Sequence, residues 1–259
     1  NLATVASGMA AMGKTPFISS YAMFSPGRNW EQIRTTICYN DQNVKIIGSH
    51  AGISVGPDGG THQAIEDLAI TRVIPNLTVV APADALEARR ATLAIAKKIG
   101  PAYLRLAREK TPVFTTEDSP FIIGRANLLW QSEKPQVLIV ATGSVNYQAL
   151  LAAKSLADEN LEVNVLNMHT IKPLDEETLI SQAKLAGAVV TVEEHQRVGG
   201  LGGAVAESLS ANWPVPVFRL GIDDEFGQSG QPEQLLEHYG LNPKDIIQAV
   251  KAVISKKKP

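Results

Sequence analysis

Short apolar segments alternate with longer helical ones along both halves of the chain, and this alternation constrains the fold more than any other feature. The short segments are rich in β-branched residues, as strands are, whereas apolar residues in the longer ones recur at helical spacing. Because consecutive parallel strands need a crossover, usually a helix, the rhythm predicts parallel sheets covered by helices on both faces. The predicted strands are 43–47, 77–80, 102–106, 137–141, 162–167 and 188–192, and the predicted helices are 1–13, 30–39, 61–73, 85–98, 146–158 and 175–186.

We therefore expect an α/β protein of two domains. The polar segment 111–120 contains two prolines and is the best candidate for the linker between them, which puts the domains at 1–117 and 118–259. A chain of 259 residues is long enough to bury a sizeable core in each domain. The three lysines at 256–258 are expected to form a solvated tail.

Composition narrows the class of protein. Lys and Arg number 24 against 26 Asp and Glu, and the net charge of −2 argues against a nucleic-acid partner. Cys38 is the single cysteine, so the chain fits a reducing cytoplasm and has no cysteine-based metal site. No apolar run approaches the roughly 18 residues that cross a bilayer, and no signal peptide is visible. We expect a cytoplasmic protein without a membrane partner.

The glycine-rich segment 48–63 is the part of the sequence richest in chemistry. Its glycines allow backbone to approach a ligand closely, and His50, Asp58 and His62 supply hydrogen-bonding and titratable groups. The predicted helix 61–73 would put His62 near a helix start, where anions are favoured. The same residues also suit a plain surface loop, whereas two histidines twelve positions apart with one carboxylate lack the usual spacing of a zinc site.

This segment resembles the corresponding loop of the transketolases. Residues 49–63 read Ser-His-Ala-Gly-Ile-Ser-Val-Gly-Pro-Asp-Gly-Gly-Thr-His-Gln, and the resemblance continues through 75–84, 103–108, 165–173 and 193–203. The resemblance spans essentially the whole chain. The chain is similar to the C-terminal subunit of split transketolases, in which two polypeptides form the enzyme. The resemblance implies a thiamine diphosphate pyrimidine-binding domain at 1–117, with its front part missing, followed by a transketolase C-terminal domain at 118–259.

Two aromatic side chains take cofactor-binding positions in that comparison. Transketolases stack aromatic rings on the aminopyrimidine of thiamine diphosphate, and Tyr21 and Phe24 fall where two of those rings lie. Ile18 stands where other members have a third ring, so that contact is not expected.

Four further residues match the family's substrate-handling groups. His50 and His62 match histidines that hold the oxygens of the ketose and assist proton transfer, which makes them the expected catalytic as well as substrate-binding residues. Asp58 matches a carboxylate that accepts a hydrogen bond from a sugar hydroxyl, and Arg108 matches an arginine that binds the sugar phosphate. Weaker phosphate candidates are Arg28 and Arg105.

Two absences bear on the cofactor site. The chain lacks the Gly-Asp-Gly segment and later asparagine that hold the diphosphate and its metal, so Mg²⁺ or Ca²⁺ is expected on an N-terminal, diphosphate-binding subunit. Family members also carry Glu-Gln just before the pair that here is Asn1-Leu2, and that glutamate activates the cofactor. The resemblance implies an α2β2 heterotetramer that moves a two-carbon ketol unit between phosphorylated sugars, the chemistry of the pentose phosphate pathway.

Other interpretations stay open at this point. A 1-deoxyxylulose-5-phosphate synthase has a similar loop but typically Asp-Arg in place of Ser49-His50, and the E1β subunit of 2-oxo acid dehydrogenases lacks the histidine pattern. A non-catalytic assembly or regulatory subunit would explain the missing glutamate. In the second half, 142–144 lacks a dinucleotide fingerprint, the glycines of 199–203 suggest close helix packing, and His195 is expected to be structural or interfacial.

Overall fold

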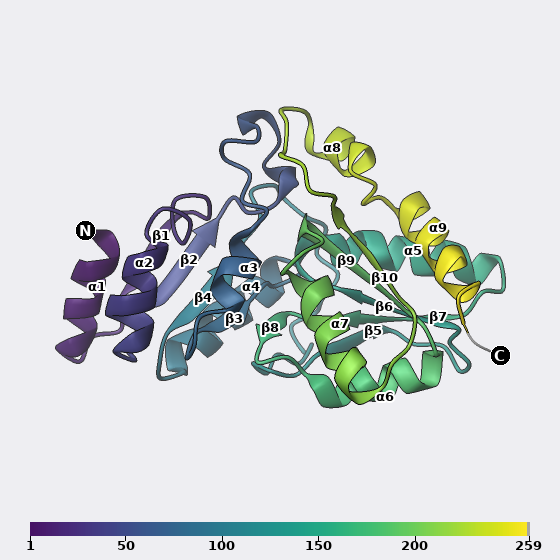
Figure 1. Ribbon diagram of the computed structural model, residues 1–259, viewed down its shortest axis with the longest axis horizontal. Helices are drawn as coiled ribbons and strands as arrows, with labels where there is room; N and C mark the ends of the chain where they lie inside the picture. Colours follow the sequence, from purple (N-terminus) through teal and green to yellow (C-terminus); the bar gives the residue numbers. More distant parts are fainter. Residues whose placement is uncertain (258–259) are drawn as a thin grey trace.

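The computed structural model describes residues 1–257 and arranges their strands in two five-stranded sheets (Figure 1). The first sheet has the order β1-β2-β4-β3-β8, with β1 (Phe17–Tyr21), β2 (Lys45–Ser49), β3 (Thr78–Val80), β4 (Ala102–Arg105) and β8 (Thr170–Lys172). The second has the order β10-β9-β6-β7-β5, with β5 (Asn127–Trp130), β6 (Val137–Ala141), β7 (Val163–Asn167), β9 (Val189–Gln196) and β10 (Val217–Ile222). Both sheets are parallel except for β8 and β5, which pair antiparallel with β3 and β7.

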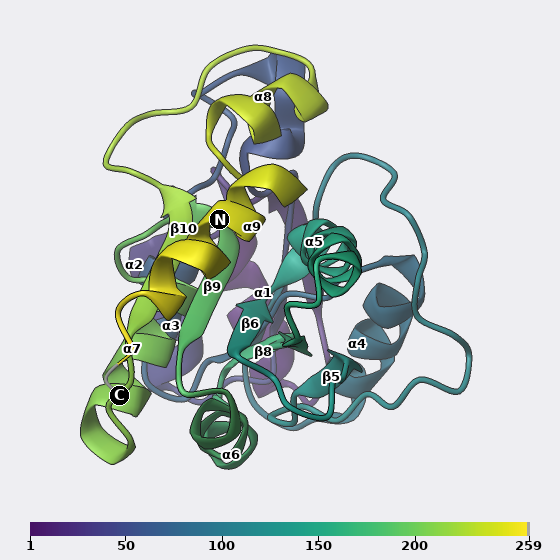
Figure 2. The same ribbon diagram turned by 90° about the vertical axis from the view of Figure 1, so that its right-hand side faces the viewer.

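Helices cover both sheets. They are α1 (Leu2–Ala11), α2 (Trp30–Gln32) continued by the π-helix η1 (Ile33–Tyr39), α3 (Asp67–Arg72), α4 (Ala85–Lys97), α5 (Asn146–Asp158), α6 (Glu176–Ala186), α7 (Leu201–Asn212), α8 (Pro232–His238) and α9 (Pro243–Ile254). Figure 2 shows α5 and α9 on one side of the second sheet and α6 and α7 on the other.

The alternation of side chains along β6 explains this layering. Leu138 and Val140 pack in a core with residues of α6 and α7, whereas Val137, Ile139 and Ala141 pack in a second core with residues of α5 and α9. Successive side chains of a strand point to opposite faces, so an all-apolar strand is buried only when both faces are covered.

Most of the predicted elements are confirmed. The strands expected around 45, 79, 104, 139, 165 and 190 are present, and so are the long helices α4, α5 and α6. Asp84 caps α4 by accepting a hydrogen bond from the Glu87 N–H, and Gly187 ends α6 in the left-handed conformation. The sequence analysis did not identify the strands β1, β5, β8 and β10.

The prediction of a helix over 61–73 is wrong for the first half of that range. Only Asp67–Arg72 are helical, and the backbone before them pairs with the start of the glycine-rich loop through a bridge between Ala51 and Ala64. His62 therefore lies in a loop and not at a helix N-terminus.

The two halves of the chain are joined through β8. This strand comes after β7 of the second sheet but pairs with β3 at the edge of the first. The segment expected to be a linker is also held in place, because the Asp84 carboxylate accepts hydrogen bonds from the N–H groups of Phe114 and Thr115.

The C-terminal lysines differ from the expected free tail. Lys257 donates hydrogen bonds to the carbonyl oxygens of Gln136 and Ala186, and Lys258 lies outside the described residues. Within residues 1–257, none of the helices is long and apolar enough to cross a membrane.

Candidate functional site

Residues 49–63, here called the site loop, leave the carboxyl end of β2 and contact the segment that precedes α8 (Figure 1). Glycines make this approach possible. A Cβ on Gly60 would lie 2.4 Å from the Gly227 carbonyl oxygen, and one on Gly59 would lie 2.5 Å from the Ser229 hydroxyl. Gly59 also has a φ of +75°, which larger residues rarely adopt. The loop is thus shaped by close backbone contact with the C-terminal half.

The side chain of Gln63 fixes the loop from inside. It is buried, and its Nε2 donates to the carbonyl oxygens of Ile53, Gly56 and Gln228, at 3.1, 3.4 and 3.0 Å. Two of these acceptors belong to the loop and the third to the segment beside it.

Four rings from two segments meet where the two ends of the site loop lie side by side. The His50 imidazole stacks on the Tyr21 ring with centroids 3.9 Å apart and an interplanar angle of 12°. His62 stands edge-on to Tyr21 at 5.8 Å and to Phe24 at 5.5 Å. The fold therefore brings together the two histidines and the two aromatic residues that the sequence analysis singled out.

Backbone and neighbouring hydroxyls orient the two histidines. His50 has a φ of +56°, a left-handed conformation that is uncommon for a residue with a side chain. Its Nδ1 lies 3.1 Å from the Ser49 hydroxyl, and Nδ1 of His62 lies 2.9 Å from the Thr61 hydroxyl. Strained backbone of this kind is concentrated at functional sites.

Asp58 belongs to the site loop, and Arg108 contacts the loop from outside. Asp58 ends the 3₁₀ segment η2 (Ile53–Asp58) and is half-buried. The Arg108 guanidinium donates to the Val55 carbonyl oxygen at 3.0 Å and to the Glu109 carboxylate at 2.7 Å. Arg108 is thus held near the loop by one uncharged acceptor and one exposed ion pair.

The interpretation of Arg105 as a phosphate-binding residue is wrong. Its guanidinium is buried and pairs with the Asp67 carboxylate at 2.8 Å, and Nη2 also donates to the Glu194 carbonyl oxygen. Burial alone would lower the pKa of Arg105, but the Asp67 carboxylate raises it above its usual value. These buried contacts leave the Arg105 guanidinium unable to bind a substrate phosphate. Arg28 is exposed and lines a hollow of about 390 Å³ together with Phe24.

Ile18 belongs to the core and not to the ring cluster. It is 4% exposed and packs with residues of α1 and η1. The aromatic wall of this chain is accordingly made by Tyr21 and Phe24.

Glycines 199–203 contribute to close packing, as expected. A Cβ on Gly200 would lie 2.1 Å from the Glu193 carboxylate, whose two oxygens accept the N–H groups of Leu201 and Gly202 at the start of α7. Burial raises the pKa of Glu193 above its usual value. The glycines let a buried carboxylate reach the helix terminus.

His195 is structural. Its ring is fully buried, Nδ1 donates to the Gln196 carbonyl oxygen at 2.7 Å, and Nε2 accepts the Ala69 N–H at 3.2 Å. These partners select the neutral imidazole with its proton on Nδ1. No group of three or more His, Cys, Asp or Glu side chains among residues 1–257 is arranged to hold a metal ion.

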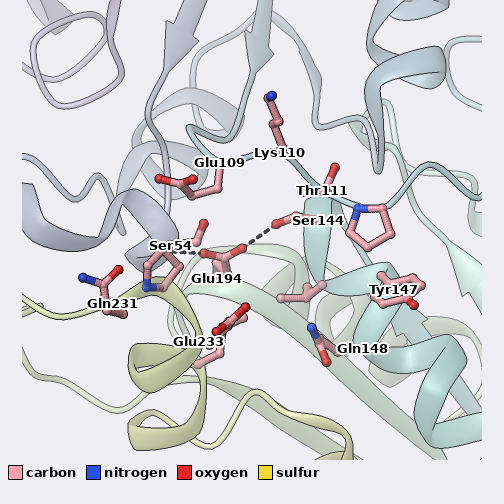
Figure 3. Close-up of a pocket in the computed structure, with 14 residues that line it drawn as sticks. Ser54, Glu109, Lys110, Thr111, Ser144, Tyr147, Gln148, Glu194, Gln231 and Glu233 are labelled. Atoms are coloured by element: carbon pink, nitrogen blue, oxygen red, sulfur yellow. Dashed lines mark hydrogen bonds between the residues drawn. The ribbon is translucent and has the colours of Figure 1, made fainter.

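The sequence analysis missed a cavity between the two halves, which is lined by both polar and apolar side chains. It has a volume of about 460 Å³, and Ser54, Ser144 and Glu194 lie along it (Figure 3). No local pattern could have revealed the cavity, because its walls come from five separate parts of the chain.

Known proteins match both halves of the chain. Residues 1–113 match the model of the transketolase pyrimidine binding domain, and residues 124–246 match that of the transketolase C-terminal domain. The chain is 42% identical over 257 residues to the 6-deoxy-6-sulfo-D-fructose transketolase subunit of Clostridium sp. (strain MSTE9), covering 99% of this chain and 79% of that protein. This chain belongs to the transketolase family.

Two further matches carry descriptions that refer to a divided transketolase. The putative transketolase C-terminal section of Methanocaldococcus jannaschii is 42% identical over 253 residues, covering 96% of this chain and 78% of that protein. A solved split gene transketolase, described as an inactive beta4 tetramer, has a TM-score of 0.93 and 46% identity, covering 100% of this chain and 82% of that one. These matches confirm the expected fold class and the expected resemblance to a split transketolase subunit.

Proposed function

We propose that this chain is the C-terminal subunit of a two-polypeptide transketolase. The enzyme transfers a two-carbon ketol unit from a ketose phosphate to an aldose phosphate, and the chain is active only together with an N-terminal subunit. The observation that carries the proposal is the meeting of Tyr21, Phe24, His50 and His62 where the two ends of the site loop lie side by side. Solvent-accessible imidazoles beside an aromatic wall suit a reaction that moves protons next to a flat heteroaromatic cofactor.

The residues present fit one end of thiamine diphosphate. Phe24 is 37% exposed and borders an open hollow with Arg28, so its ring offers a free face to an aminopyrimidine. The sequence lacks the Gly-Asp-Gly segment that holds the diphosphate and its metal in the family, which is why we assign the diphosphate end and its Mg²⁺ or Ca²⁺ to the partner subunit. When bound, thiamine diphosphate supplies a carbon nucleophile that cleaves the bond beside the ketose carbonyl.

The histidines are assigned to the sugar oxygens. His50 and His62 hold hydroxyl and carbonyl oxygens of the donor, release a proton when negative charge develops on oxygen, and take it back in the second half-reaction. Their Nδ1 atoms are engaged by Ser49 and Thr61, so Nε2 is the atom that each ring presents to a substrate.

Asp58 and Arg108 are assigned to substrate recognition. Asp58 accepts a hydrogen bond from a sugar hydroxyl, and a sugar of the wrong configuration would leave this acceptor unpaired. Arg108 releases the weak, exposed contact with Glu109 and pairs instead with the sugar phosphate.

The assembly we propose is an α2β2 heterotetramer in the cytoplasm, acting on the phosphorylated sugars of the pentose phosphate pathway. The split relatives support the partner subunit, and the inactive tetramer of a β subunit alone supports the need for it. A non-catalytic assembly subunit and a 1-deoxyxylulose-5-phosphate synthase are the alternatives that the experiment must separate.

Reconstitution tests the proposal. The protein is purified and mixed with the N-terminal subunit, thiamine diphosphate and Mg²⁺. We expect ketol transfer only from the mixture, with a sedimenting species of two copies of each chain. Transfer by the isolated chain, or a mixture that binds cofactor without transferring ketol, would refute the proposal.

The relative from Clostridium raises a second candidate for the donor, because its name assigns it to a sulfosugar. A sulfonate carries one negative charge where a phosphate carries close to two, so Arg108 would bind either. Donor kinetics with fructose 6-phosphate and 6-deoxy-6-sulfofructose decide between them, and a higher kcat/KM for the sulfonate would transfer the assignment to sulfosugars.

A further inference from the structure

A residue of the C-terminal half supports the site loop directly. Glu194, near the end of β9, is 4% exposed, and its Oε2 accepts the Ser54 N–H at 2.9 Å (Figure 3). Its Oε1 accepts the hydroxyl hydrogen of Ser144, which precedes α5. One carboxylate thus connects the loop to the second sheet, and hydrogen bonds to a charged acceptor are among the strong ones.

The backbone of the same residue supports the other end of the loop. The Glu194 carbonyl oxygen accepts Arg105 Nη2 at 2.8 Å, and that nitrogen also donates to the Ala64 carbonyl oxygen at 3.3 Å. Arg105 is in turn fixed by its ion pair with Asp67. Glu194 therefore supports the loop at two points. Its carboxylate binds the Ser54 N–H, and its carbonyl oxygen binds Arg105, which contacts Ala64 just after the loop.

Apolar packing and the Glu194 carboxylate hold neighbouring residues of the loop. Ile53 is buried in the core beside β9 and α8, whereas Ser54 and Glu194 border the cavity of about 460 Å³, so on that side the loop is held by the carboxylate. The Ser54 hydroxyl is buried and makes no hydrogen bond within residues 1–257. Gly52 allows the close approach, since a Cβ there would lie 2.7 Å from Glu194 Oε2, and its φ is +86°.

We propose that Glu194 is a positioning residue for ketol transfer, whose carboxylate holds Gly52–Ser54 and so fixes His50 and Asp58 on either side. The inference rests on the proposed function of the site loop. Glu194 itself does not touch the ring cluster and acts through the backbone. A displacement of about 1 Å in a reacting group can cost on the order of 100-fold in rate.

The test compares Glu194→Ala with Glu194→Gln in the enzyme assembled from both subunits. Alanine removes both hydrogen bonds, and we expect kcat/KM to fall about 100-fold, mostly through kcat. Glutamine has the same shape, can accept from the Ser54 N–H and can donate to Ser144, so we expect it to retain activity within about tenfold of wild type. Glu233→Ala is the matched control, because this exposed carboxylate of α8 lines the same cavity.

Amide hydrogen exchange on the chain gives a second measurement independent of activity. We expect Glu194→Ala to accelerate exchange within 52–58 and leave α6 and α9 as protected as in wild type. Glu233→Ala should change neither exchange nor rate. If the alanine variant does not fold, Ser144→Ala removes one of the two hydrogen bonds and should give a smaller change in the same direction.

Two results would overturn the inference. One is unchanged exchange in 52–58, and the other is accelerated exchange with wild-type kcat/KM. A wild-type assembly without transferase activity would overturn the proposed function and the catalytic part of this inference with it. Wild-type activity that Glu194→Ala leaves intact would overturn this inference alone.

Discussion

At the scale of single residues, the two histidines share one aromatic wall but face it differently. His50 lies flat on Tyr21, whereas His62 stands edge-on to Tyr21 and Phe24. We expect His50→Ala and His62→Ala each to lower kcat of the assembled enzyme by about 100-fold or more, because each removes a proton donor and acceptor for the sugar oxygens. Initial rates at saturating donor measure the effect.

The control for these variants is His238→Ala, which removes an exposed histidine from the last turn of α8. It should leave kcat unchanged. Wild-type rates from both site variants would remove the histidines from the mechanism.

The Arg108 variant tests substrate recognition, whereas the histidine variants test proton transfer. We expect Arg108→Ala to raise KM for a phosphorylated donor at least tenfold and to change KM for the unphosphorylated sugar little, because only the former loses a charge-assisted hydrogen bond. Arg89→Ala, at an exposed position on α4, is the control. An equal rise in KM for both sugars would contradict a phosphate role.

The polar residues of the site loop could be foreseen from the sequence, whereas Glu194 could not. His50, Asp58 and His62 lie within one short segment whose pattern is recognisable. Ser54 and Glu194 are separated by 140 positions, and only the packing of β9 against the site loop brings them together. The buried role of Arg105 was missed for the same reason, since Asp67 is 38 positions away.

At the scale of elements, a single carboxylate secures both a helix and the connection between the halves. Asp84 accepts the Glu87 N–H at the start of α4 and the N–H groups of Phe114 and Thr115. Burial alone would raise the pKa of Asp84, but these hydrogen bonds lower it below its usual value. The ionised form is therefore the one that the fold favours.

We expect Asp84→Ala to lower the free energy of unfolding by about 2–4 kcal/mol at neutral pH, since it removes a helix cap and leaves buried N–H groups unpaired. The folded pKa lies below the unfolded one, so this contribution is fully present above the unfolded pKa and disappears as the pH falls through the folded pKa. Urea unfolding at neutral and acidic pH measures it. Asp118→Ala, at an exposed position, should have no effect, and a loss of stability that persists at low pH would contradict the assignment.

Elements were predictable where the local pattern is strong and were missed where neighbours determine them. The central strands β6 and β7 are continuously apolar or buried, but β1 lies at a sheet edge and carries Ser19 and Ser20. The short strand β8 has three residues, and its pairing with β3 joins positions about 90 apart. The first half of the expected helix 61–73 instead pairs with the start of the site loop, which no helical periodicity could reveal.

At the scale of the whole molecule, the two halves share a core. One cluster of buried apolar residues contains Ile46 and Val79 of the first sheet together with Leu138 and Val140 of the second. The site loop adds polar contacts across the same boundary. The predicted boundary at 117/118 therefore divides the sequence at a point where the apolar core is continuous, and a fragment ending there would expose part of that core.

This continuity predicts that the two halves unfold together. Trp30 reports on the first half, where its Nε1 donates to the Ile70 carbonyl oxygen, and Trp130 reports on β5. In variants that retain either Trp30 or Trp130 as the single one of the chain's three tryptophans, the fluorescence midpoints in urea should coincide, because losing either half uncovers the apolar surface of the other. Leu138→Ala, which opens a cavity in the shared cluster, should shift both midpoints downward by the same amount. Separate midpoints, or a shift confined to Trp130, would mean that the shared core does not couple the unfolding of the two halves. Either half could then unfold alone, and the site loop, which contacts both, would lose its shape when the first of them unfolds.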